Sequence, residues 1–108
     1  MQITEFKLEG DSAIHLVLFD GGAYLIAEMP AAQCLPKKTR DRKAIVAARK
    51  KFETHCGKPT NHWKQLGAVA TISGVGFFDI PHTQEPHAAN FAELHPVTGI
   101  TFVSGCGA

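Results

Sequence analysis

Apolar and polar residues alternate at the start of the chain, which is the pattern of a half-buried β-strand. Over residues 2–9 this period of two places Thr4 and Phe6 on one face and charged residues on the other. Residues 12–19 and 23–29 are further apolar runs of strand length. The first third of the chain therefore predicts three strands.

A tight turn separates the second and third of these strands. The sequence there is Asp20-Gly21-Gly22, and glycine tolerates the positive φ that such turns need. We therefore expect a hairpin. Because His15 and Glu28 stand in its two apolar runs, they are expected to lie on adjacent strands. If both point inward, they form a His–Glu pair with His95 nearby, serving either as a structural network or as a site.

The apolar pattern changes to helical spacing after Pro30 and Pro36. Residues 39–56 predict a helix that Thr39 caps and Gly57 closes. Its buried stripe would be Ile45, Ala48, Phe52 and Cys56. Residues 66–78 then predict a fourth strand, bent at Gly74 and Gly76. Residues 97–103 predict a fifth strand with Pro96 at its entrance.

This order predicts a mainly β protein with one helix between strands three and four. A five-stranded barrel with the helix in that place is the OB architecture, so we expect residues 1–108 to form a single OB-like domain. The alternative is another small α+β sheet. The length suits one domain, and neither a signal peptide nor a membrane-spanning run is evident, which favours a cytoplasmic protein without membrane contact.

Charge is distributed unevenly along the chain, although the formal net charge is only +1. Residues 37–64 hold ten basic and two acidic residues, a net of +8, and the remainder carries a net of −7. This predicts a basic surface on and around the helix, where single-stranded nucleic acid or another anionic ligand could bind. The candidate contacts are Arg40, Lys43, Lys50, Lys51, Lys58 and Lys64. A solvated helix face is the alternative.

Several short motifs resemble a family of small bacterial OB-like proteins of uncharacterised function. They are IHLVL at residues 14–18, AEMP followed by Cys34, GVGFFD at residues 74–79, and ELHPV at residues 93–97. The resemblance implies an OB-like barrel and brings no activity and no catalytic residue. The chain departs from the family pattern at Thr83-Gln84-Glu85-Pro86-His87, so Glu85 and His87 are not supported by it.

Histidine and acidic residues gather in the long connection expected between strands four and five. From this composition we expect a pocket for a small ligand that is lined by His15, Glu28, Asp79, His82, Glu93 and His95. The alternative function is a metal-assisted hydrolase that uses Asp79, His82, Glu93 and His95. Its divalent metal would take His82, His87, Glu93 and His95 as ligands. A third interpretation is that these side chains only bind the loop to the barrel.

The chain has three cysteines and no CxxC pair, so a structural zinc site of the usual spacing is not expected. The odd number in a cytoplasmic chain favours free thiols, with a bridge between Cys34 and Cys56 as the alternative.

Overall fold

The computed structural model describes residues 1–78 and 92–106, which form five strands, one 3₁₀ turn and one helix. The fold is therefore mainly β, with the helix between the third and fourth strands in sequence order. The elements are β1 (Gln2–Leu8), β2 (Ile14–Asp20), β3 (Ala23–Met29), η1 (Ala32–Cys34), α1 (Arg42–Cys56), β4 (Lys64–Phe78) and β5 (Ala92–Ser104).

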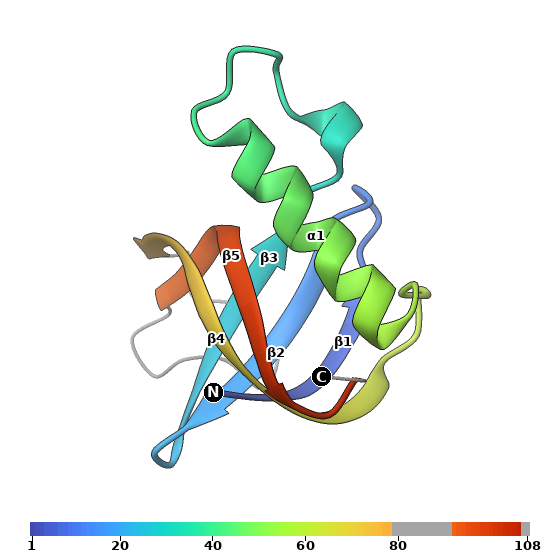
Figure 1. Ribbon diagram of the computed structural model, residues 1–108, viewed down its shortest axis with the longest axis vertical. Coiled ribbons are helices and arrows are strands. Elements are labelled where there is room, and N and C mark those ends of the chain that lie inside the picture. The colour runs from blue at the N-terminus through green and yellow to red at the C-terminus, as the bar shows by residue number, and fades with distance from the viewer. Residues whose placement is uncertain (79–91, 107–108) are drawn as a thin grey trace.

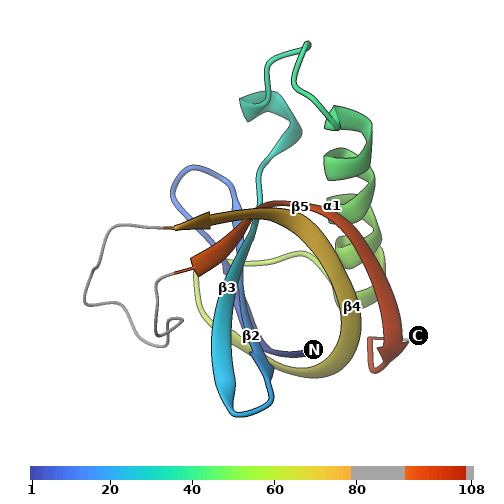
Figure 2. The same cartoon turned by 90° about the vertical axis from the view of Figure 1, so that its left-hand side faces the viewer.

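The strands form a closed ring in which the hydrogen-bonded neighbours run β1-β2-β3-β5-β4 and β4 pairs back onto β1 (Figures 1 and 2). All neighbouring pairs are antiparallel except β3 and β5, whose parallel contact is short and joins Ile26 to Glu93 and Ala27 to Leu94. The long strands β4 and β5 curve strongly, as Figure 2 shows. Their curvature is what allows one sheet to close on itself.

The predicted hairpin between β2 and β3 is confirmed. Asp20 pairs with Ala23, and the two residues between them, Gly21 and Gly22, have φ angles of 57° and 85°. Two successive positive φ angles define the tight turn that matches the twist of paired strands, and glycine adopts them at little cost. This turn fixes the register of the whole hairpin, including the pair of His15 with Glu28.

The helix begins three residues later than predicted, at Arg42. Asp41 stands at the N-cap with φ 59° and makes no capping side-chain bond, so the predicted cap at Thr39 is wrong. The Thr39 carbonyl instead accepts the backbone N–H of Arg42 in the preceding turn. Gly57 closes the helix with φ 88°, as predicted.

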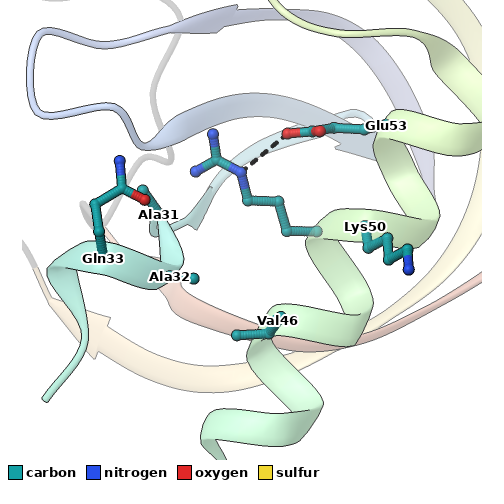
Figure 3. Close-up of a pocket in the computed structure, with 7 residues that line it drawn as sticks. Ala31, Ala32, Gln33, Val46, Lys50 and Glu53 are labelled. Atoms are coloured by element: carbon teal, nitrogen blue, oxygen red, sulfur yellow. Dashed lines mark hydrogen bonds and ion pairs between the residues drawn. The ribbon is translucent and has the colours of Figure 1, made fainter. Parts of the chain in front are cut away.

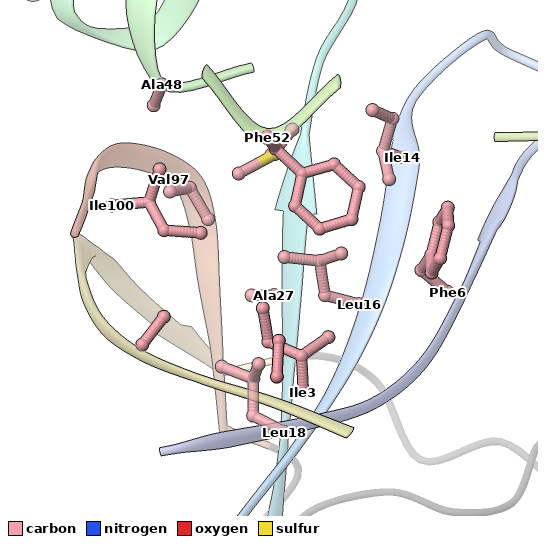
Figure 4. Packing of buried hydrophobic residues seen from close by; sticks show 13 residues of the cluster. Ile3, Phe6, Ile14, Leu16, Leu18, Ala27, Ala48, Phe52, Val97 and Ile100 are labelled. Atoms are coloured by element: carbon pink, nitrogen blue, oxygen red, sulfur yellow. The ribbon is translucent and has the colours of Figure 1, made fainter. Parts of the chain in front are cut away.

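The core lies inside the ring, and α1 closes it against β5 (Figures 2 and 4). The buried helix residues are Ile45, Ala48 and Phe52, as the helical spacing predicted. Phe52 is fully buried, with its ring centroid 5.0 Å from that of Phe6 on β1. Burial of such a side chain contributes about 1.5–3 kcal/mol, which makes Phe52 the main attachment of the helix to the sheet.

Strand β1 does not follow the strict alternation of its sequence. The buried residues are Ile3 and Phe6, whereas Thr4, predicted on the buried face, is half-buried and donates its hydroxyl to the Val17 carbonyl. The register of β1 shifts between Ile3 and Glu5 against both of its neighbours. A bulge of this kind inserts one residue into the pattern, so the inward positions become three apart.

Strand β5 begins at Ala92, five residues before the predicted start, so the predicted position of Pro96 at its entrance is wrong. The register against β4 shifts on both sides of Gly74, and such a bulge tolerates a proline that cannot donate to the ladder. A Cβ on Gly74 would lie 2.8 Å from the Pro96 carbonyl oxygen, so only glycine fits there. Glu93 and His95 therefore lie on a strand and not in the expected loop.

A disulfide joins Cys56 at the end of α1 to Cys106 after β5, so the prediction of free thiols is wrong for these two residues. Cys34 is free and exposed, which also excludes the alternative Cys34–Cys56 bridge. The pairing depends on the return of the chain end to the helix, which sequence spacing did not reveal. His55 supports the same junction, because its ring stacks on Phe102 and Nδ1 lies 3.3 Å from the Cys106 carbonyl oxygen.

Candidate functional site: a histidine–glutamate cluster and a basic surface

A row of polar side chains crosses the ring on its first three strands. Lys7 on β1 pairs with His15 on β2, and His15 pairs with Glu28 on β3. The neighbouring residues Leu16 and Ala27 belong to the core, so the row lies on the opposite, outer face of the sheet. His15 and Glu28 are thus adjacent as expected, but they do not point into the core.

His15 lies between two carboxylates. Its Nδ1 is 3.0 Å from Glu9 Oε1 and 3.5 Å from Glu28 Oε1, which are ion-pair distances. Neither contact has hydrogen-bond geometry, and both ring nitrogens are buried without a hydrogen-bond partner among the described residues. The contacts are electrostatic and poorly directed. Reorientation of either carboxylate would convert its own contact with His15 into a hydrogen bond.

Glu28 connects His15 to a second histidine. Its Oε2 lies 3.1 Å from His95 Nε2 on β5, which reaches the row because β3 and β5 are neighbours. At the other end of the row, Lys7 Nζ lies 4.0 Å from Glu9 Oε2. We call Lys7, Glu9, His15, Glu28 and His95 the His–Glu cluster.

The structure places the remaining predicted site residues as follows. Glu93 is buried on β5 beside Ile26, two residues before His95. Asp79, His82 and His87 lie outside the described residues, so their part in the pocket or in a metal site stays a prediction. Within residues 1–78 and 92–106, no group of three or more His, Cys, Asp or Glu side chains is arranged to hold a metal ion.

Trp63 forms one wall of the cluster and was not predicted there. Its ring is edge-on to His15 at 5.6 Å between centroids, and Lys7 Nζ lies 4.9 Å above the indole. Glu9 and Lys7 were missed too. The pairing of the first two strands could have placed Lys7 opposite His15, but nothing local in the sequence brings Trp63 to this face.

The six predicted polyanion contacts are all exposed. We call this set the basic surface: Arg40, Lys43, Lys50, Lys51, Lys58 and Lys64. Arg40 lies 3.8 Å from Asp41 with a side chain that is 95% exposed, and the other five form no ion pair with a described residue. Their charges therefore face solvent.

Two further cations of the helix have structural contacts instead. Arg49 donates to Glu53, to the Ser12 carbonyl and to the Met29 carbonyl, while Arg42 donates to the Ala32 carbonyl. These bonds join α1 to the end of β3 and to the turn before β2. The basic segment of the sequence thus divides into two groups. Arg42 and Arg49 stabilise the fold, and the basic surface is open to a partner.

A cavity of about 300 Å³ that is widely open to solvent lies between α1 and the segment after β3, away from the place where we expected the main pocket (Figure 3). Its lining contains none of the six predicted pocket residues. The lining residues are Ala31, Ala32, Gln33, Val46, Arg49, Lys50 and Glu53. A gap between η1 and α1 forms the cavity. The sequence pattern did not predict this gap.

Comparisons with protein-family models, curated proteins and solved structures found no match. The family resemblance of the motifs therefore stays a prediction. Among residues 1–78 and 92–106, no helix has the length and apolar character needed to cross a membrane.

Proposed function

We propose that this chain is an OB-like binding module whose basic surface holds a polyanion, namely single-stranded nucleic acid. The fold part of the proposal is supported by the closed ring of five strands, the parallel contact of β3 with β5, and a helix between β3 and β4. A five-stranded Greek-key barrel of this kind is a common carrier of oligonucleotides.

The exposure of the basic surface is the single observation that carries the function. Lys43 and Lys50 are seven residues apart on α1, so they project from one side of the helix, opposite the buried Ile45 and Phe52. Lys51 is exposed beside them. Cations that neutralise phosphates release condensed counterions, and that release drives binding without any need for a preformed pocket.

The outer face of β1–β3 is a poorer surface for phosphates. Glu9, Glu28 and Glu93 lie on or beside the polar row and would repel a phosphate backbone, while Lys7 is already within reach of Glu9. The single-stranded nucleic acid is therefore expected to follow α1 and the residues after it. This differs from the usual OB site, which uses the sheet face and the loops beside it.

Fluorescence anisotropy with a labelled single-stranded oligonucleotide tests the proposal. For single strands, the logarithm of the binding constant falls with the logarithm of salt concentration at about 0.7 per neutralised phosphate, so four contacts give a slope of about −2.8. The matched control is Lys7→Gln, which removes one positive charge from the outer face and should leave the slope unchanged. Absence of binding at low salt, or binding indifferent to salt, would disprove the function.

A further inference from the structure

The cavity between η1 and α1 has two walls of different character. Ala31 and Ala32 with Gln33 form one wall at the end of β3, and Val46, Lys50 and Glu53 stand on the helix opposite, as Figure 3 shows. Arg42 ties the walls together, because its Nη2 donates to the Ala32 carbonyl at 3.3 Å. A residue outside the lining therefore helps to hold the two walls together.

Arg49 is the fixed charge in this lining. Its Nε donates to Glu53 Oε1 at 3.1 Å, and its Nη1 donates to the carbonyls of Ser12 at 2.7 Å and Met29 at 3.1 Å. These bonds use three of the five guanidinium donors, and the two on Nη2 bond no described residue. Because the side chain is only 16% exposed and already ordered, a ligand that binds it does not have to immobilise it.

The lining has more donors than acceptors. Arg49 is cationic and Glu53 is anionic, the Lys50 side chain extends away from both in Figure 3, and Gln33 adds an amide donor and a carbonyl acceptor. The Arg49 Nη2 donors, which bond no described residue, favour a carboxylate, and Glu53 disfavours a second negative charge on the ligand.

We propose that this cavity binds a small α-hydroxy or α-amino carboxylate. The ligand's carboxylate would accept from Arg49 Nη2 and the Gln33 amide, and the hydroxyl or ammonium group beside it would donate to Glu53. A short apolar side chain would contact Ala31, Ala32 and Val46. The volume of about 300 Å³ is at the lower end for small-molecule sites, so it suits such an acid.

The site does not depend on the proposed nucleic-acid binding, although Lys50 borders both. Val46 lines the cavity and is not part of the basic surface, while Lys43 belongs to the basic surface and does not line the cavity. Substitutions at these two positions therefore separate the two activities.

The test is an NMR titration of ¹⁵N-labelled protein with lactate, alanine, acetate and inorganic phosphate at constant ionic strength. We expect saturable amide shifts at Ala31, Gln33 and Val46 with lactate or alanine, and at least tenfold weaker binding of acetate, which lacks the adjacent donor. The arms with lactate and alanine decide between the hydroxy and the amino acid. Equal shifts with all four anions would overturn the proposal, because they would indicate general charge screening.

Two variants complete the test. Val46→Phe fills the cavity and should weaken binding of the preferred acid at least tenfold, while its matched control Ala47→Phe adds the same ring at an exposed neighbouring position and should leave the affinity unchanged. If Val46→Phe disturbs folding, Gln33→Leu replaces it in the test, because Gln33 lies outside the helix. Gln33→Leu should weaken binding severalfold. Unchanged affinity in both Val46→Phe and Gln33→Leu would also overturn the site, whatever Lys43→Gln does to oligonucleotide binding.

Discussion

The His–Glu cluster and the basic surface are both rich in ionisable side chains, but they use them in opposite ways. In the cluster every member lies within 4.0 Å of another member, from Lys7 through Glu9 and His15 to Glu28 and His95. In the basic surface only Arg40 lies within 4.0 Å of a carboxylate oxygen among the described residues. Paired groups stabilise the molecule, and groups without partners are available to a ligand.

This difference predicts opposite responses to substitution. Removing one member of a partly buried network removes its electrostatic contacts, which lowers the free energy of unfolding. Removing an exposed cation that contacts only water changes stability by less than about 0.5 kcal/mol. The cluster should therefore respond in stability and the basic surface in binding.

The largest loss of stability is expected at Phe52, which packs the helix that carries part of the basic surface against the core. Phe52→Ala leaves a cavity between α1 and the ring and should lower the free energy of unfolding by about 3–5 kcal/mol. Urea denaturation followed by circular dichroism measures it. A loss below about 1 kcal/mol would mean that α1 is held by something other than its core contact.

The disulfide gives a comparable effect from the other end of the helix. A double Cys56→Ser and Cys106→Ser variant releases a loop of about 50 residues and should lose about 4 kcal/mol by the chain-entropy estimate. Urea midpoints with and without reductant check this. Cys34→Ser is the matched control, and it should change the urea midpoint little because Cys34 is exposed and forms no disulfide. Equal stability of the double variant and the wild type would contradict the bridge.

A smaller effect is expected in the His–Glu cluster. Glu28→Ala removes the carboxylate shared by His15 and His95 and should lower the free energy of unfolding by about 0.2–1 kcal/mol, with oligonucleotide affinity unchanged or slightly raised. Glu28→Gln keeps an acceptor oxygen and should lose less. If Glu28→Ala is as stable as the wild type, the cluster is not a structural network.

The cluster also shows which contacts the sequence could predict. His15 and Glu28 were found because the two-residue turn at Gly21 and Gly22 sets the register of the hairpin by itself. Trp63 and Glu9 were not found, since their approach depends on how a distant connection and a strand end fold onto the sheet. A local pattern determines register, whereas contacts between remote segments need the closed ring.

The same distinction explains the errors in the fold. Strands and helix were predicted from periodicity, but the bulge after Ile3 moved the buried position away from Thr4, and the bulge at Gly74 allowed β5 to extend through Pro96. The exposure of Lys43, Lys50 and Lys51 followed directly from helical spacing. The cavity beside Arg49 was not predictable, because its walls come from two elements whose separation no sequence pattern records.

The smallest change in stability and the most direct test come from the same variant. Lys43, Lys50 and Lys51 are replaced by glutamine together, and the salt dependence of oligonucleotide binding is compared with that of the wild type by anisotropy. If these side chains contact phosphates, the slope should become shallower by about 2, at 0.7 for each contact, while the urea midpoint stays unchanged. An unchanged slope in a folded variant would contradict the assignment of the basic surface to polyanion binding.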